Sequence, residues 1–389
     1  MKRYRILGAA FVMQLCLGAT YAWSVFVLPL KQAAGISQGT AQLPFSLFYF
    51  AFPATMIVTG TLLPKIGPRR CAVIGGVFFG GGWLLAALGR THFSLTVLGI
   101  GLIAGIGVGF AYIVPIATCI RWFPRQKGLV TGVAVAGFGG GAAMVSHTAD
   151  YLMQTIGLTP FGAFGLLGLS FLLLVTLAGW AMENPPDGPA AIRWQLPLTA
   201  VFRDRAFVWL YLAMFCGLAA GFAVNANMKE LVGNASVQAG VEAVAAFALA
   251  NAAGRIIWGW LFDRSRSIWI LQSNLWLQAG LLMAHGWVLR SETGLATFAV
   301  LSGFNYGGIL VLYALAAAEK WGSHRLSQIY GWLFSANIPA AISPIVAGVV
   351  FDRLGSFAPV LWGIGALLGC GALALGVGVR LQPKPSSTS

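Results

Sequence analysis

The sequence predicts an all-α integral membrane protein with twelve transmembrane helices. Hydrophobic residues make up 58% of its 389 residues, charged residues only 9%, and the mean hydropathy is +0.81. A water-facing surface of ordinary composition cannot be assembled from such a chain. Its apolar segments have the length of about 20 residues that a helix needs to cross a bilayer. The short alternating segments of a membrane β-barrel are not seen in the sequence.

Twelve apolar segments follow one another along the chain. They are Ile6–Leu30, Ala41–Leu63, Cys71–Leu88, Phe93–Ile120, Gly128–Met153, Phe161–Met182, Phe207–Asn227, Val237–Phe262, Ile268–Leu289, Leu295–Ala318, Leu326–Phe351 and Ala358–Val379. Several contain glycine or proline, which membrane helices tolerate when neighbouring helices satisfy the freed backbone groups. We therefore expect each segment to span the membrane.

The basic residues predict how these spans are oriented. Of the 24 Lys and Arg, eighteen lie at the termini or in even-numbered loops. Five lie on the other side, namely Lys31, Arg90, Lys229, Arg290 and Arg353. By the positive-inside rule both termini are cytoplasmic, in the inner (plasma) membrane. The net charge of +14 thus reflects orientation and not nucleic-acid binding, and the residue left over is Arg255, inside the eighth span.

An internal repeat predicts two halves. The stretches beginning at Arg121 and Lys320 align Trp122 with Trp321, and Gly60–Lys65 aligns with Gly259–Arg264 at the same shift. We expect six spans in residues 1–182 and six in 206–380, a polar, proline-rich linker at 183–205 and a short cytoplasmic tail at 381–389. Parallel halves of this kind occur in a large transporter fold whose substrate site lies between the halves near the membrane midplane.

The loop after the eighth span, GWLFDR, resembles the G-x-L-x-D-R signature of the major facilitator superfamily, and this resemblance extends over nearly the whole chain. An echo follows span 11, and the first half has a partial copy in which Pro64 replaces the acid. The resemblance implies gating or packing roles for Gly259, Asp263, Arg264, Gly60, Gly67, Arg69 and Asp352. Glycine permits close helix approach, while the acid can meet a helix amino terminus or basic loop groups.

A narrower resemblance is to the oxalate/formate antiporter family and the related monocarboxylate transporters. It is carried by GATYAWSVF in span 1, RWFP before span 5, FNYGG in span 10, and Asn251 with Arg255 in span 8. In that family the span 8 arginine binds the substrate carboxylate, so the resemblance implies this role for Arg255. The candidate substrate-binding residues are Arg255, Asn251, Tyr112, Tyr306, Tyr21, Asn337 and Phe334.

Physical reasoning on Arg255 leads to the same site. A charge at a helix centre costs about 2.5–3.5 kcal/mol on insertion scales, so it usually faces a bundle interior or an aqueous path. Two structural explanations stay open. The side chain could snorkel past Phe262, about 10 Å away along the helix, or pair with Glu242, about 20 Å away. A guanidinium offers a charged fork that matches a carboxylate, and Asn251, one turn earlier, can donate a second hydrogen bond.

Two departures from the resembled families bear on the substrate. Asn337 stands where oxalate exchangers carry a lysine, so one fixed charge favours a monoanion such as formate, lactate or pyruvate. Asn251 stands where animal monocarboxylate transporters carry an aspartate, which leaves both proton symport and anion exchange open. The expected partners are a small carboxylate, a co-transported proton in the symport case, and the bilayer, with the protein a monomer.

Other functions are open at this stage. A drug or other organic-solute exporter of the same fold is the main alternative, and a non-transporting receptor is a further one. An enzyme is not expected, because the four His and five Cys are scattered along the chain. No metal or other cofactor is expected.

Overall fold

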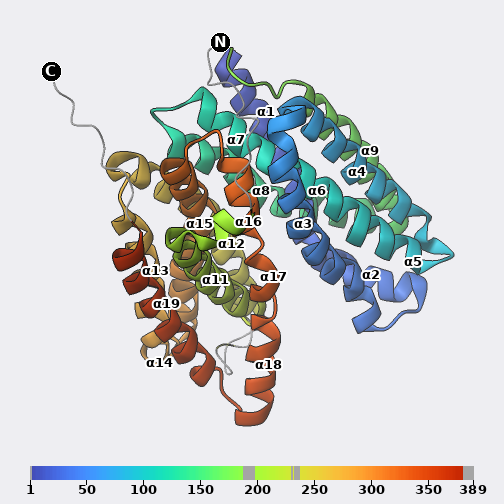
Figure 1. Cartoon of the computed structure of the whole chain (residues 1–389). Helices are drawn as coiled ribbons and strands as arrows, with labels where there is room; N and C mark the ends of the chain where they lie inside the picture. The colour runs from blue at the N-terminus through green and yellow to red at the C-terminus, as the bar shows by residue number, and fades with distance from the viewer. Residues whose placement is uncertain (1, 187–197, 229–230, 232–236, 380–389) are drawn as a thin grey trace. The chain divides into compact units, whose positions relative to one another are not determined.

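The computed structural model describes residues 2–186, 198–228, 231 and 237–379, and most of them are helical (Figure 1). No β-strand occurs among these residues. Eleven helices in the described part of the chain are long and apolar enough to cross a membrane. The ninth predicted span instead divides into α13 (Ile268–Met283) and the short α14 (His285–Val288). The predicted all-α membrane class is confirmed.

The chain divides into two compact units. The first comprises Met1–Pro124 and Val133–Arg193, and the second comprises Arg125–Gly132 and Trp194–Ser389. Helix α8 (Lys127–Asp150) therefore begins in the second unit and continues in the first. The predicted tail and much of the predicted linker lie outside the described residues, so the domain boundaries drawn from the sequence stay a prediction.

The first unit is built mainly around α4, which packs against α9 and against α6 and η3, and α3 packs against the same α6 and η3. Its remaining bounds are α1 (Lys2–Leu17), η1 (Gly18–Ala22), α2 (Ser24–Ala34), α3 (Gln38–Ile66), α4 (Pro68–Ala87), η2 (Leu88–Arg90), α5 (Phe93–Thr96), η3 (Val97–Ala104), α6 (Gly105–Ala111), α7 (Ile113–Trp122), η4 (Tyr151–Thr155) and α9 (Pro160–Trp180). The Trp83 ring of α4 lies 6.0 Å from that of Phe26 and 5.2 Å from that of Phe171. These buried aromatic contacts hold α2 and α9 on α4.

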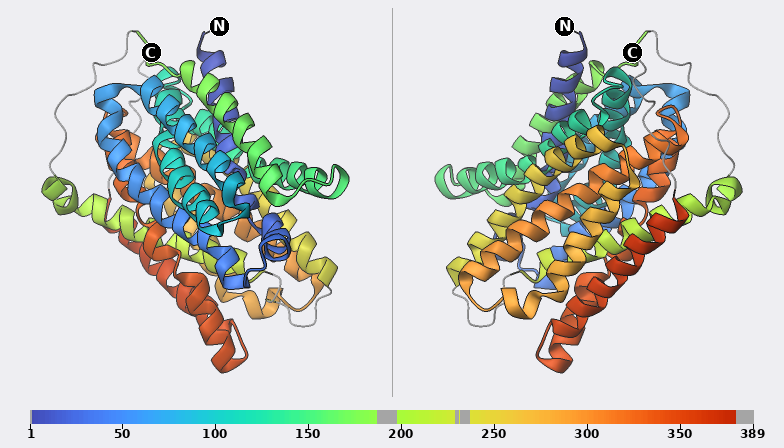
Figure 2. Two further views of the ribbon diagram at one scale, coloured as in Figure 1. Left: turned by 90° about the vertical axis from the view of Figure 1, so that its right-hand side faces the viewer. Right: turned by 90° about the vertical axis from the view of Figure 1, so that its left-hand side faces the viewer.

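The second unit is centred on the pair α12 and α15, with α19 packed against α11 and α13. Its other bounds are α10 (Leu198–Arg203), α11 (Arg205–Ala226), α12 (Val237–Ser265), α15 (Glu292–Trp321), α16 (Leu326–Phe334), α17 (Asn337–Ala340), α18 (Ser343–Leu354) and α19 (Ala358–Gly378). Figure 2 shows α18 and α19, in orange and red, as an antiparallel hairpin. The α12 and α15 pairing is what positions the candidate site.

Besides span 9, other predicted spans are not continuous α-helices. Span 11 divides into α16, α17 and α18, and spans 1 and 4 contain the 3₁₀ segment η1 and the π-helical segment η3. In span 11 Pro339 lies in α17, between the two breaks, and Pro344 lies in the first turn of α18. Proline lacks the N–H of a regular helix and is tolerated in a first turn, but in a helix interior its ring clashes with the carbonyl four residues earlier. Asn337 Nδ2 donates to the Phe334 carbonyl at 2.7 Å and so satisfies one of the freed backbone groups.

Candidate functional site

Arg255 and Asn251 lie one turn apart on α12 in the second unit. Their exposed fractions are 2% and 5%, and Arg255 is among the largest fully buried side chains. Along the helix axis Arg255 lies about 20 Å from Glu242 and about 15 Å from Ser265, the two ends of the candidate span. A snorkelling arginine exposes its guanidinium, so the burial of this side chain contradicts that explanation.

Glycines on neighbouring helices fix the backbone of α12 at these two residues. A Cβ on Gly307 of α15 would collide with the Asn251 carbonyl oxygen, and one on Gly132 of α8 would collide with the Arg255 carbonyl oxygen. Gly132 belongs to the part of α8 that groups with the second unit. Side chains on either glycine would push the neighbouring helix away, so both glycines set the positions of Asn251 and Arg255.

Tyr306 of α15 directly precedes Gly307 in the sequence, and Gly307 is the glycine that approaches Asn251. It is 7% exposed, and its ring lies 6.0 Å from the rings of both Phe222 and Phe247. Phe247 lies one turn before Asn251 on α12. The structure therefore brings Tyr306 to the α12 segment that leads into the site.

The other candidates lie on other elements. Asn337 and Phe334, 5% and 3% exposed, lie at the first break of span 11, and the Asn337 amide caps the Phe334 carbonyl there. Tyr21 and Tyr112 belong to the first unit, where both rings pack edge-on against Phe138, at 5.1 Å and 5.3 Å. Tyr112 is 1% exposed.

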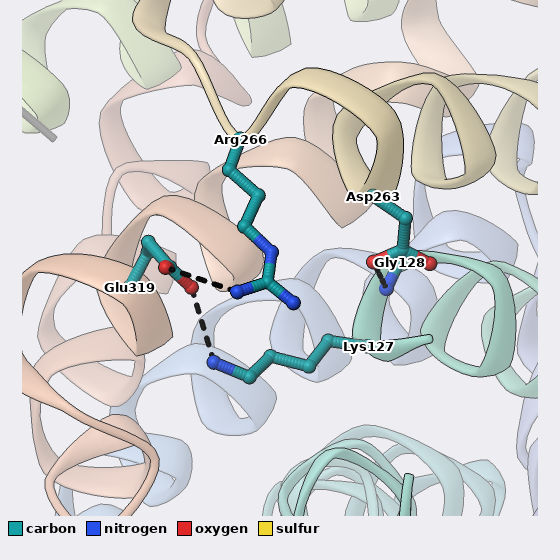
Figure 3. A network of polar contacts seen from close by, with 5 residues as sticks. All are labelled: Lys127, Gly128, Asp263, Arg266 and Glu319. Atoms are coloured by element: carbon teal, nitrogen blue, oxygen red, sulfur yellow. Dashed lines mark hydrogen bonds and ion pairs between the residues drawn. The ribbon is translucent and has the colours of Figure 1, made fainter. Parts of the chain in front are cut away.

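A second constellation surrounds the amino terminus of α8 (Figure 3). Asp263 accepts hydrogen bonds from the backbone N–H groups of Gly128 at 2.7 Å and Leu129 at 2.8 Å. These N–H groups have no partner inside their own helix, and a carboxylate there is also favoured by the helix dipole. Gly259, one turn before Asp263, approaches the Gly128 backbone, so a side chain on either glycine would separate the two helices.

An ion-pair network lies beside this cap. Glu319, at the end of α15, forms ion pairs with Lys127 Nζ at 3.0 Å and with Arg266 Nη1 at 3.8 Å (Figure 3). All three side chains are less than 20% exposed. Sequence reasoning missed this network. The available signal was Glu319, an acid at a helix end on the side of the membrane where most of the basic residues are predicted to lie.

The remaining predicted gating residues are more scattered. Arg264 lies over the Trp260 ring at 3.8 Å, and Arg69 of the first unit is 3.8 Å from Glu183. Gly60 is a buried residue of α3, and Gly67, with φ of 84°, separates α3 from α4. Asp352 is a residue of α18 whose side chain lies outside the described part of the structure. Among the described residues no group of three or more His, Cys, Asp or Glu could hold a metal ion.

Comparisons with known proteins identify the class. The chain aligns over 96% of its length with a crystal structure of the Escherichia coli fucose:proton symporter, covering 98% of that chain with a TM-score of 0.75 at 14% identity, which shows a shared fold. The profile of the Major Facilitator Superfamily matches residues 10–235. The chain belongs to this superfamily, and family and fold identify a multi-pass membrane transporter rather than an enzyme.

Similar curated proteins include anion transporters. An uncharacterized MFS-type transporter of Escherichia coli (strain K12), YhjX, is 26% identical, with 85% of this chain and 84% of that protein covered. The oxalate:formate antiporter of Oxalobacter formigenes is 23% identical, with 86% and 81% covered. Human monocarboxylate transporter 11 is 26% identical, with 80% and 63% covered. The predicted resemblance to these families is thereby confirmed.

Proposed function

We propose that this protein is a secondary active transporter of a small monocarboxylate, of the formate, lactate or pyruvate type, working by alternating access. The observation that carries the proposal is the complete burial of Arg255 near the middle of a membrane span. Similarity to an oxalate:formate antiporter and to a monocarboxylate transporter supports the same substrate class.

Arg255 supplies the main attraction for the substrate. A guanidinium stays charged at physiological pH, and its planar N–H groups can donate two parallel hydrogen bonds to one carboxylate. The Asn251 side-chain amide, one turn away on the same helix, can donate another. Tyr306 is proposed as a wall of the site, with Tyr21, Tyr112, Phe334 and Asn337 as further substrate-binding candidates.

The charge at this site favours a monoanion. Among residues whose burial is described, Arg255 is the single fully buried member of the Lys, Arg, Asp and Glu set. A bound monocarboxylate matches its charge, whereas oxalate leaves a net negative charge whose burial costs several kcal/mol. Formate, lactate and pyruvate therefore fit the charge better than oxalate does.

The same charge couples substrate binding to the conformational change. Closing a site around the Arg255 cation desolvates it, while a bound monoanion offsets that cost and permits the conformational change. Anion exchange satisfies this condition in both half-cycles. Proton symport also requires the empty carrier to return, and both modes stay open. We propose that Asp263, with Gly259, Arg264 and the partial repeats at Gly60, Gly67, Arg69 and Asp352, acts in gating at the cytoplasmic side, with both chain termini cytoplasmic.

Uptake into proteoliposomes tests the proposal. Labelled formate, lactate, pyruvate and oxalate are offered with and without a pH gradient, and with each anion preloaded inside. We expect uptake of at least one monocarboxylate and its loss in Arg255→Gln, with Arg290→Gln, an arginine outside the site, as the matched control. Dependence on the pH gradient indicates symport, and dependence on the preloaded anion indicates exchange. Normal uptake by Arg255→Gln, or no uptake of any carboxylate, contradicts the proposal.

A further inference from the structure

The second unit contains a small cavity, lined mainly by apolar atoms, that the proposed transport site does not account for. Its volume is about 10 Å³. Asn274, Leu275 and Gln278 of α13, Asn305 and Tyr306 of α15, and Leu368 of α19 contribute to its lining. All of these elements belong to the second unit, so the cavity is internal to that unit.

Three buried amide side chains are the polar groups that the cavity's described lining includes besides Tyr306. The exposed fractions of Asn274, Gln278 and Asn305 are 1%, 5% and 4%. Asn274 Nδ2 donates to the Asn305 backbone carbonyl at 2.9 Å, and Gln278 Nε2 donates to Ser302 Oγ at 3.2 Å. The amides of Asn274 and Gln278 therefore join α13 to α15 through their nitrogen atoms.

Their oxygen atoms have no such contacts. Asn274 Oδ1, Gln278 Oε1 and Asn305 Oδ1 are buried and make no hydrogen bond within the described part of the chain. Turning the Asn274 amide over would place its oxygen against a carbonyl oxygen, so its orientation is set by that contact. Each buried acceptor without a donor costs about 1–3 kcal/mol. Three around one cavity indicate a bound hydrogen-bond donor.

We propose that this cavity binds one ordered water molecule, whose two O–H groups donate to two of these three oxygens, Asn305 Oδ1 among them. A water needs about 10–15 Å³ of this kind of space and two to four polar partners. The cavity lies at the lower end of that range, and the buried amide groups supply the partners. A monovalent cation is the competing occupant. Transferring a cation into such a site costs several kcal/mol, and no acidic side chain is among the described residues that line the cavity to offset it.

This assignment separates two asparagines that the sequence alone does not distinguish. Asn305 becomes a ligand of the buried water, and Asn251 stays with Arg255. The water then completes the polar contact between α13 and α15, with an immobilisation cost of about 0–2 kcal/mol. This inference is independent of the transported substrate.

Hydroxyl-radical footprinting by X-ray pulses tests the site in the intact purified protein, because radicals formed from a bound water oxidise adjacent buried side chains. Leu275 lines the cavity and Leu282 lies two turns away on α13, and both are 0% exposed. We expect oxidation of Leu275 at least several times that of Leu282, with ¹⁸O incorporated after brief exchange into labelled water. Equal oxidation of the two leucines overturns the proposal.

Two further measurements identify the ligand and its holders. Asn305→Leu should lower Leu275 oxidation toward the Leu282 level, and unchanged oxidation removes Asn305 from the site. Melting temperatures of wild-type protein in sodium chloride and choline chloride at equal ionic strength should agree. A sodium-dependent increase that disappears in Asn305→Leu overturns the water assignment in favour of a cation.

Discussion

At the scale of single residues, the charge of Arg255 could be predicted to matter because the positive-inside rule accounts for the other basic residues and leaves this one. Its burial on α12 agrees with that reasoning. Glu319, Lys127 and Arg266 could not be identified in the same way. These three charged residues lie far apart in the sequence and form ion pairs only in the folded protein. In the sequence they look like any other charged residues near the ends of predicted spans.

Arg255→Lys separates the effect of charge from that of shape. Lysine keeps the positive charge but loses the planar pair of donors. Because a charged hydrogen bond contributes about 1.5–3 kcal/mol, we expect monocarboxylate affinity to fall by about 10- to 150-fold, with a larger loss in Arg255→Gln. Substrate-induced quenching of tryptophan fluorescence measures the affinity. Equal affinities for wild type and Arg255→Lys show that charge alone is sufficient.

At the scale of elements, the predicted spans recovered the helices but not their interruptions. Pro339 and Pro344 were visible in span 11, yet proline in a membrane helix is compatible with either a kink or a break, and the choice depends on neighbouring groups such as the Asn337 amide. The close approach of α15 to α12 could not be predicted from the sequence either. In the sequence Gly307 looks like the other glycines of the spans, and only the structure shows that it faces the Asn251 carbonyl oxygen.

Replacing Gly307 with alanine tests how α12 is positioned. Its Cβ would meet the Asn251 carbonyl oxygen, so Gly307→Ala should lower the free energy of unfolding by about 1–3 kcal/mol and weaken substrate binding. Gly280→Ala on α13 is the control, because nothing lies within 4 Å of the added atom. Thermal melts and uptake assays measure both. Similar behaviour of the two variants rejects the positioning role of Gly307.

Removing the Asp263 carboxylate tests the cap on α8. Asp263→Ala leaves the N–H groups of Gly128 and Leu129 without their acceptor, at a cost of about 0.5–2 kcal/mol. We expect faster hydrogen–deuterium exchange in the first turn of α8, with exchange in α19 unchanged. Asp263→Asn, which retains one side-chain oxygen acceptor, should lie between wild type and Asp263→Ala. Unchanged exchange at Leu129 contradicts the assigned cap.

At the scale of the whole molecule, composition and span length are sufficient to predict a helical membrane protein. A chain with so few charged residues can be placed in a bilayer at low cost, and this property depends on overall composition rather than on any single contact. The twofold repeat adds an expectation of two halves. It does not reveal that residues 125–132 group with the second unit, since that depends on the packing of Gly128 and Gly132 against α12.

Cysteine accessibility tests the proposed orientation. Ser267 and Ser291 each cap a helix, α13 and α15, and lie on opposite sides of the membrane in the predicted topology. In intact cells and a cysteine-free background, a membrane-impermeant maleimide should label Ser291→Cys and spare Ser267→Cys until the cells are opened. The reverse pattern places the termini outside.

The buried Arg255 has a further consequence for biosynthesis. Residues 237–265 leave the ribosome before α15, whose Gly303 and Gly307 pack against them, has been made. Until then these contacts are missing, and an arginine at a helix centre costs about 2.5–3.5 kcal/mol on insertion scales. We therefore expect span 8 to insert less readily by itself than after α15 has been synthesised.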